Sequence, residues 1–347
     1  MKGAVFDVYA VMDARMPLRD VPAHAQRAER MGYSGLTVPE ALHDGFFAAL
    51  LALEHTRNLR VATSILLAFP RSPMTVAYAA WDLQALSGGR LELGLGTQVR
   101  ANMEGRYSVE WKPPIPRMRE YTAALRVIWD AWQNGSPLQF EGEHYHFTRM
   151  QPFFNPGPIE HPAVPIFLGG VNRLMTRLAG ETADGLMTHP TNTSPRYLRE
   201  LTVPNIETGA KRADRSPTEV VVLVGGFVAT GPTLAAVQAG RERIREYLTF
   251  LYSTPQYWPS LELYGWGEVG RRLHQLTRES RWDEMKNVIS DGMLDQLVPA
   301  GRYEEIGQVL CEWYGGCASS ITFPMPDDPK HDAEAASVIQ TLQAAAA

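Results

Sequence analysis

The feature that most constrains the fold is a regular alternation of short apolar runs with longer segments of helical periodicity. Eight apolar runs recur, at residues 3–9, 35–39, 59–67, 90–96, 164–170, 183–188, 219–228 and 318–326. Strands that alternate with helices form parallel sheets, because each helix carries the chain back to the same edge of the sheet. Eight such units predict an α/β fold of the closed (β/α)8 or TIM barrel type, rather than an open doubly wound sheet.

Local signals support helices between these runs. Residues 72–89 begin with Ser72, a good N-cap, followed by Pro73 at the first helical position, and end in Gly88 and Gly89. Two stretches break the alternation, a hairpin-like and proline-rich one at about 134–162 and a tryptophan-rich one at about 253–300. We interpret them as insertions, after the fourth helix and before the eighth strand, on a single domain spanning residues 1–347.

Composition narrows the classes of partner. The 347 residues are 45% hydrophobic and 20% charged, with a net charge of −5, so a nucleic-acid partner is not expected. Asp7 interrupts the first apolar run, and "VVVLVGGFVA" is too short to span a bilayer. The spacing of Cys311 and Cys317 matches neither a zinc site nor a redox motif. We therefore expect a cytoplasmic protein with no membrane partner.

In a barrel of this kind, functional side chains lie at the carboxyl ends of the strands. That rule selects Asp7 and Tyr9 after the first strand, Glu40 and His43 after the second, and Thr188 and His189 after the sixth. His144 and His146 would share one face of a strand, but no third ligand is near them, so no metal site is expected.

Gly169 and Gly170 end the fifth apolar run directly before a helical segment. This arrangement brings backbone N–H groups and a helix N-terminus to the carboxyl edge of the barrel, where a phosphate binds well. A tight strand-to-helix turn without a ligand explains the two glycines equally well. The sequence at this turn leaves both interpretations open.

Several longer segments resemble the luciferase-like oxidoreductases of bacteria, in particular the branch that uses the deazaflavin coenzyme F420. The segments are "GLTVPEALHDGF", "TSILLAFPRSPMTVAYAAWDLQALSGGRLELGLGTQVRAN", "REYTAALRVIWDAW" and "VPIFLGGVNRLMTRLAGETADG". The resemblance implies the same barrel fold and a hydride transfer between F420 and a small organic substrate. FMN-dependent monooxygenase activity is the first alternative, and a flavin-binding protein without activity is the second. We also expect a homodimer.

The resemblance also implies roles for individual residues. The cofactor phosphate would lie at the turn formed by Gly169, Gly170, Val171 and Asn172, with His189 nearby. Its ring would pack on a cis peptide bond between Ser64 and Ile65, and Thr97 and Asn102 would line the ring or its side chain. Glu40, and with a weaker match His43, would be the catalytic groups.

One departure from the family pattern limits the substrate. Related sugar-phosphate dehydrogenases carry a glycine and a glutamate after the threonine that corresponds to Thr97, whereas this chain has Gln98 and Val99. That substrate is therefore not assigned. Aromatic residues expected near the mouth, Tyr9, Phe46, Trp111 and Trp266, suggest an apolar or planar substrate. Four arginines, Arg100, Arg106, Arg173 and Arg177, could form a basic path for the acidic tail of F420.

Overall fold

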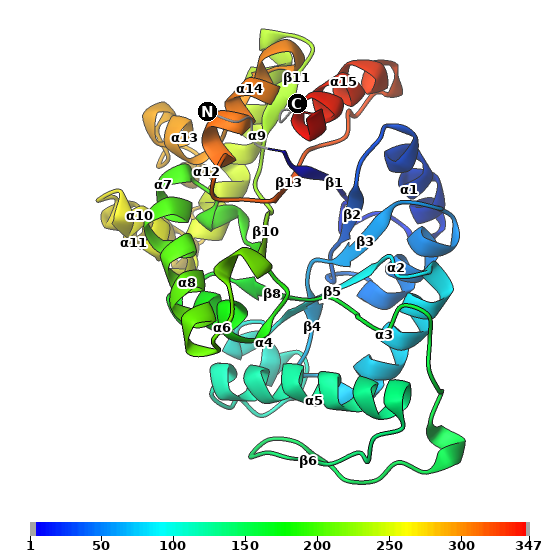
Figure 1. Ribbon diagram of the computed structural model, residues 1–347. Coiled ribbons are helices and arrows are strands. Elements are labelled where there is room, and N and C mark those ends of the chain that lie inside the picture. Colours follow the sequence, from blue (N-terminus) through cyan, green and yellow to red (C-terminus); the bar gives the residue numbers. More distant parts are fainter. Residues whose placement is uncertain (1–4, 345–347) are drawn as a thin grey trace.

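The computed structural model describes residues 5–344 and places the strands in a closed ring surrounded by helices (Figure 1). Within those residues the ring contains eight parallel strands, joined by a pairing of β3 with β5. Their cyclic order is β1 (Asp7–Val11), β2 (Gly35–Val38), β3 (Arg60–Thr63), β5 (Leu91–Gly96), β8 (Ile166–Gly170), β9 (Gly185–Thr188), β10 (Val221–Val224) and β13 (Ser320–Thr322). The (β/α)8 barrel predicted from the alternation is confirmed.

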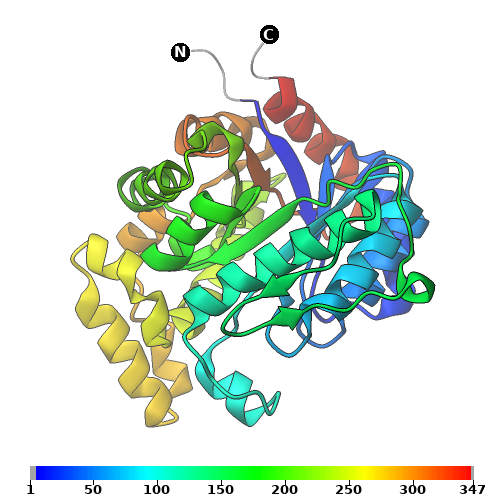
Figure 2. The same cartoon turned by 60° about the horizontal axis from the view of Figure 1, so that its bottom comes forward.

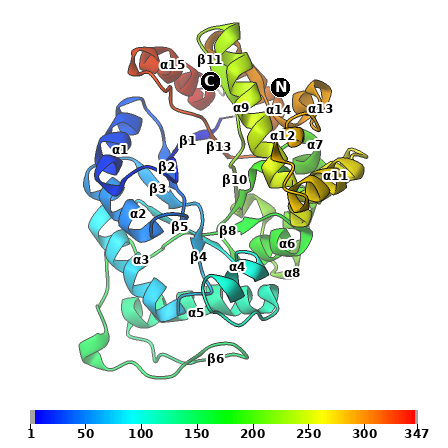
Figure 3. The ribbon, with the colours of Figure 1, turned by 180° about the vertical axis from the view of Figure 1, so that it is seen from behind.

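The helices cover the outside of the ring and bury their apolar faces against it (Figure 3). Those that follow successive strands are α1 (Val21–Arg30), α2 (Gly45–Glu54), α3 (Pro73–Ser87), α4 (Arg100–Gly105), α5 (Pro114–Asn134), α6 (Arg173–Thr182), α7 (Pro195–Tyr197), α8 (Val203–Arg212), α9 (Leu234–Tyr252), α14 (Tyr303–Tyr314) and α15 (Asp332–Ala344). The limits of α3 follow from the signals in the sequence, because Ser72 Oγ accepts a hydrogen bond from Met74 N at 3.3 Å and Gly88 has φ +64°.

The first strand differs from its expected position. It begins at Asp7 rather than at residue 3, and residues 1–4 lie outside the described part of the chain. Asp7 therefore lies at the amino end of the barrel, where it pairs with Arg60 at 2.7 Å. Tyr9 is buried inside the barrel, where its hydroxyl donates to Glu92 at 2.9 Å and burial raises its pKa. The expectation that these two residues reach the mouth was wrong, because an apolar run does not fix its own register against the neighbouring strands.

The predicted third strand is also interrupted. Its apolar run forms β3 and the short strand β4 (Leu66–Leu67), which pairs with β5 beyond a break at Ser64 and Ile65. The peptide bond between these two residues is cis, as the resemblance predicted. The break lies at the carboxyl end of the barrel, between the two strands β3 and β4.

Both stretches interpreted as insertions carry small elements of their own. The first holds the hairpin of β6 (Phe140–Glu141) and β7 (His146–Phe147), whose turn is fixed by three backbone N–H groups that donate to Glu120. The second holds α10 (Trp258–Leu263), α11 (Gly267–Arg278), α12 (Trp282–Met285) and α13 (Asp291–Leu297), and β12 (Ala300–Arg302) follows it and pairs with β11 (Ala229–Gly231). Helices α10 and α11, coloured yellow in Figure 2, lie to one side of the barrel.

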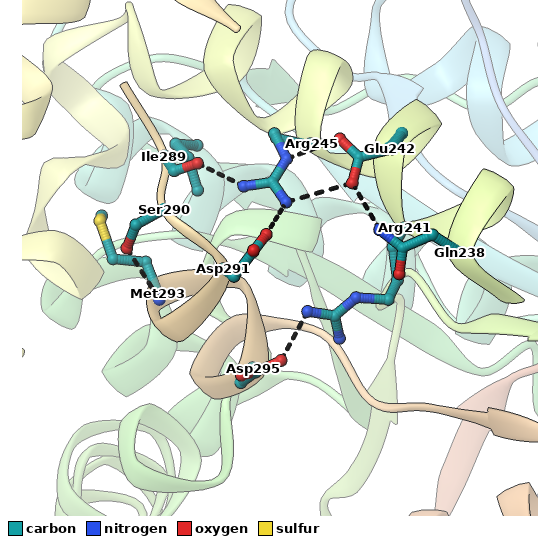
Figure 4. Close-up of polar contacts among 9 residues, drawn as sticks. All are labelled: Gln238, Arg241, Glu242, Arg245, Ile289, Ser290, Asp291, Met293 and Asp295. Atoms are coloured by element: carbon teal, nitrogen blue, oxygen red, sulfur yellow. Dashed lines mark hydrogen bonds and ion pairs between the residues drawn. The ribbon is translucent and has the colours of Figure 1, made fainter. Parts of the chain in front are cut away.

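The second insertion is attached firmly to α9. The buried Arg245 guanidinium of α9 donates to Glu242, to Asp291 and to the carbonyl oxygen of Ile289, and Arg241 pairs with Asp295 at 2.5 Å (Figure 4). A second apolar cluster, which includes Leu248, Leu273 and Leu294, fills the space beneath these contacts. One face of α9 is therefore held by the insertion, and the opposite face is available to the barrel mouth.

The two ends of the described chain meet at the amino side of the barrel, where Phe6 N donates to the carbonyl oxygen of Leu342 at 3.1 Å. Between residues 5 and 344, every helix is too short or too polar to cross a lipid bilayer.

Candidate active site

A large cavity opens at the carboxyl ends of the strands, with a volume of about 1300 Å³. Nine of the eleven residues predicted to act in catalysis or to bind the cofactor line it: Glu40, Ser64, Ile65, Thr97, Gly169, Gly170, Val171, Asn172 and His189. His43 and Asn102 are not among its lining residues. Single ligands usually occupy sites of roughly 300–1,000 Å³, so this cavity has room for a cofactor and a second molecule together.

The turn between β8 and α6 offers unused hydrogen-bond donors. Asn172 is the N-cap of α6, and its side-chain oxygen accepts from the N–H groups of Leu174 and Met175, each at 3.1 Å. Among residues 5–344, the N–H groups of Val171, Asn172 and Arg173 have no acceptor. Three successive free N–H groups at the positive end of a ten-residue helix form a site suited to a phosphate.

The two glycines before this turn are explained by packing. A Cβ atom at Gly170 would lie 2.7 Å from Leu186 Cδ1, and one at Gly169 would lie 3.0 Å from Ile65 Cγ2. Gly96 has the same function on the neighbouring strand, because a Cβ there would lie 2.3 Å from Ile65 Cδ1. The side chain of Ile65 is thus wedged between two glycines and forms the wall of the cavity next to the free N–H groups.

Glu40 lines the cavity but is already engaged. Its carboxylate accepts from Leu67 N at 2.7 Å and from both terminal nitrogens of Arg71, at 3.1 and 2.7 Å. Arg71 also pairs with Asp44, which is the N-cap of α2. This arrangement fixes the loop after β2 to the loop after β4, and every hydrogen bond that Glu40 accepts comes from that second loop or from β4.

The turn after β5 contains a cavity-lining residue that the sequence did not single out as part of the site. Gln98 lines the cavity and has φ +59°, which side-chain-bearing residues seldom adopt. Its side-chain oxygen accepts from Val99 N at 2.9 Å and from Asn102 Nδ2 at 3.2 Å. Asn102 thus supports Gln98, which lines the cavity together with Thr97, Val99 and Arg100.

His189 is held in one orientation at the cavity wall. Its Nδ1 accepts from Thr191 N at 3.4 Å and lies 2.9 Å from Thr191 Oγ1, so the ring proton belongs on Nε2. Burial lowers the pKa of His189 to about 4, which keeps the ring neutral near pH 7. The ring stacks on Tyr257 of the second insertion at 4.4 Å. Nε2 has no protein partner among the described residues and can donate to a ligand.

Asn192 connects His189 to the free N–H groups of the α6 turn. Its side-chain oxygen accepts from His189 N at 2.8 Å, and its Nδ2 donates to the carbonyl oxygen of Gly170 at 3.1 Å. Asn192 is itself buried. Neither Asn192 nor Tyr257 was predicted from the sequence, because nothing local indicates that Tyr257 meets His189 across 68 residues of chain.

A second part of the cavity, which we call the distal lobe, lies on the opposite arc of the barrel, above β10, β13 and β1. The segment around β11 and one face of α9 supply Phe227, Thr230, Pro232, Ala239, Arg243 and Ile244. The β1–α1 region, the start of α14 and the segment after β13 supply Met16, His24, Arg27, Tyr303, Met325 and Asp327. Of the four aromatic residues expected at the mouth, Trp111 lines the cavity, whereas Tyr9, Phe46 and Trp266 do not.

The four arginines proposed as a basic path are mostly engaged. Arg100 pairs with Glu104 at 3.1 Å, Arg106 donates to the carbonyl oxygen of Ala41, and Arg177 donates to Asn205. Arg173 has no partner among residues 5–344 and follows the three-residue turn directly. Across the same residues, no cluster of three or more His, Cys, Asp or Glu side chains is arranged to hold a metal ion.

Comparison with known proteins shows the family to which this sequence belongs. The family described as luciferase-like monooxygenase matches residues 1–320. An uncharacterised protein of Mycobacterium tuberculosis is 43% identical over 282 residues, which cover 81% of this chain and 83% of that protein. An F420-dependent glucose-6-phosphate dehydrogenase of Amycolatopsis mediterranei is 27% identical over 216 residues, 58% of this chain and 62% of that one.

The fold is also similar to that of a solved structure, a coenzyme F420-dependent tetrahydromethanopterin reductase from Methanopyrus kandleri. The TM-score is 0.78 at 17% identity, with 98% of each chain covered. At this identity the similarity supports the barrel fold alone, whereas the family match covers most of the sequence. The chain therefore belongs to the luciferase-like monooxygenase family.

Proposed function

We propose that this protein is an oxidoreductase that transfers a hydride between coenzyme F420 and a small organic substrate. The observation that carries the proposal is the group of three free N–H donors at Val171, Asn172 and Arg173, next to the wall formed by Ile65. A phosphate at the start of α6 would bring a tricyclic ring onto that wall. F420-dependent enzymes among the similar proteins support the choice of cofactor.

The residues of the cavity fit this cofactor in distinct ways. Val171, Asn172 and Arg173 would bind the phosphate through their N–H groups, and Asn192 would keep the turn in place. Ser64, Ile65, Thr97 and Gln98 would orient the ring. When bound, a deazaflavin supplies a carbon centre that exchanges a hydride, which limits it to two-electron chemistry. His189 would hold the proton at Nε2 and donate a hydrogen bond to the cofactor or substrate beside it.

Glu40 and His43 have different roles in this proposal. Because Arg71 and Leu67 N already occupy the carboxylate, Glu40 acts by positioning the loops around the ring. His43 lies outside the lining of the cavity and would reach a ligand only after movement of its loop. We therefore assign neither of them to proton transfer in the present arrangement.

An FMN-dependent monooxygenase is the main alternative, because the matching family is described as luciferase-like monooxygenase. Both cofactors carry a ring, a ribityl chain and a phosphate, so the α6 turn would bind either one. F420 continues beyond its phosphate into a tail of carboxylates, and Arg173 is the described arginine beside the turn that lacks a partner. A single exposed cation contributes about 0–1 kcal/mol to binding, so it favours F420 only slightly.

Parallel titrations of the purified protein with F420 and with FMN test the proposal. The expected result is saturable binding of F420 with a lower Kd than that of FMN, followed by turnover of bound reduced F420 with an organic acceptor. Tighter binding of FMN, with oxygen consumption by the reduced complex, would replace the proposal with the monooxygenase. Binding of a cofactor without any turnover would support the flavin-binding protein instead.

We also propose that the chain acts in the cytoplasm as a single domain and forms a homodimer. Exposed apolar side chains at Leu42, Phe47 and Leu50, on or beside α2, support a protein partner at that face. Light scattering during size-exclusion chromatography measures the dimer directly.

A further inference from the structure

Each arginine that lines the distal lobe lies near a carboxylate of the protein. Arg27 pairs with Asp332 at 2.6 Å and also donates to the carbonyl oxygen of Pro326. Arg243 pairs with Asp327 at 3.9 Å across the opening between α9 and the segment after β13. In the described part of the chain, each arginine that lines this lobe has a carboxylate within 4.0 Å, so an anionic ligand would have to compete with that carboxylate.

Other charged groups around the cavity follow the same rule. Glu40 pairs with Arg71, Arg100 with Glu104, and Asp328 with Lys330. Asp13 differs, since among residues 5–344 its carboxylate accepts only from the N–H group of Arg15 and has no cationic partner. An unpaired carboxylate at the rim of the cavity repels an anionic ligand.

The remaining lining of the lobe is apolar, with two neutral polar atoms. Met16, Phe227, Ile244 and Met325 supply adaptable apolar contacts. His24 Nε2 and Thr230 Oγ1 are buried and have no hydrogen-bond partner. Burial, assisted by Arg27, lowers the pKa of His24, so its ring is neutral near pH 7. Both atoms lie just beneath the cavity surface, so an uncharged ligand would form a hydrogen bond with either one after a small shift of the wall, which would remove the cost of an unsatisfied buried polar group.

We propose that the distal lobe binds an uncharged, largely apolar organic substrate that carries a carbonyl or hydroxyl oxygen, and that it excludes anionic substrates such as sugar phosphates. This inference rests on the proposed function, which gives the identity of the cofactor that shares the cavity with the substrate. The lobe itself is defined by the described residues alone, and the volume of the whole cavity leaves room for both molecules.

The side of the lobe formed by α9 is held in place before a ligand arrives. Arg241 and Arg245 fasten one side of α9 to α13 (Figure 4), while Ala239 and Arg243, on another face of the same helix, line the lobe. A preformed wall loses little conformational entropy on binding, which favours a rigid apolar ligand. Because α9 is fastened to α13, the helix would not move aside for a bulky side chain at Ala239, and that side chain would fill part of the lobe.

Two ligands with the same skeleton test the proposal. The probes are 2-acetonaphthone, a neutral aromatic ketone, and 6-acetyl-2-naphthoate, which adds one carboxylate. Binding is measured by titration calorimetry, with and without a saturating amount of whichever cofactor the protein binds. We expect the ketone to bind at least about tenfold more tightly than the carboxylate, because the added charge would have to compete with carboxylates that already lie beside the arginines of the lobe. Equal or tighter binding of the carboxylate, or no binding of the ketone up to its solubility limit, would overturn the proposal.

Substitutions on α9 locate the binding site. Ala239→Trp fills the lobe and should weaken ketone binding at least about tenfold. Ala235→Trp is the matched control, because Ala235 lies on the same helix, is exposed and does not line the cavity. Ala239→Arg supplies the missing cation and should reverse the preference in favour of the carboxylate. If Ala239→Trp and Ala235→Trp affect the ketone equally, the distal lobe is not its site.

The test separates this inference from the proposed function. If neither F420 nor FMN binds, the proposed function fails, and the ketone titrations on the cofactor-free protein still decide the character of the lobe. If a cofactor binds and Ala239→Trp leaves both its affinity and that of the ketone unchanged, the proposed function stands and the distal lobe does not bind the substrate.

Discussion

Replacing Arg173 with proline removes one phosphate-binding group while preserving the helix. Arg173 is the first residue of α6, and its N–H group has no acceptor in the described chain, so proline costs no intrahelical hydrogen bond there. Asn172 has φ −117° and ψ +163°, which are the angles favoured by a residue before proline. The substitution should therefore leave the fold intact and delete one donor to the phosphate.

The magnitude follows from the kind of hydrogen bond that is lost. A hydrogen bond to a charged group contributes about 1.5–3 kcal/mol, which corresponds to a roughly 10- to 150-fold increase in the Kd of the cofactor. The side chain of Arg173 contributes at most about 1 kcal/mol as an exposed cation. Arg173→Ala keeps the N–H group and removes the charge, so it should raise the Kd by less than about fivefold.

Titration of both variants with F420 and FMN, together with thermal unfolding of each, provides the assay. The account requires Arg173→Pro to weaken both cofactors clearly more than Arg173→Ala does, with similar melting temperatures. If the two variants bind equally well, the phosphate does not lie at the start of α6. Gly170→Val is a poorer test, because Leu186 would be displaced whether or not a phosphate binds there.

Two further predictions concern groups in the cavity wall. The pKa of His189 in the folded protein, about 4, is below the ordinary value of about 6.5, so the unfolded chain takes up a proton first as the pH falls. The free energy of unfolding should therefore drop by about 2 kcal/mol between pH 7 and pH 5 because of this group. Urea unfolding at the two pH values should show a smaller drop in the His189→Gln variant. Equal drops in both proteins would contradict the assignment. Glu40→Gln removes acceptors from Arg71 and should lower stability by about 1–3 kcal/mol, whereas His43→Ala should change it by less than about 0.5 kcal/mol. A stable Glu40→Gln variant that binds cofactor normally but has lost turnover would instead make Glu40 a catalytic group.

The sequence predicted the barrel because the alternation of strands and helices depends on local patterns. The N-cap at Ser72 and the turn at Gly88 lie where the local sequence signals predicted them. The limits of β1 were wrong, since its register depends on the packing of Tyr9 against Gly35. That contact joins residues far apart in sequence, and no local pattern reports it.

The candidate site was predictable only in part, for the same reason. Residues that follow strands, such as Asn172 and His189, could be identified because the barrel collects strand ends on one face. The position of Glu40 was indicated too, but its engagement by Arg71 was not, because the two residues belong to different loops. The stack of Tyr257 on His189 depends on how the second insertion folds over the mouth.

The most direct test of the account is a crystal structure of the protein with bound F420. The account predicts phosphate oxygens within about 2.7–3.2 Å of at least two of the N–H groups of Val171, Asn172 and Arg173, with the ring against Ile65 and the distal lobe still open. A phosphate bound elsewhere, or a ring that lies in the distal lobe beside Ala239, would contradict it.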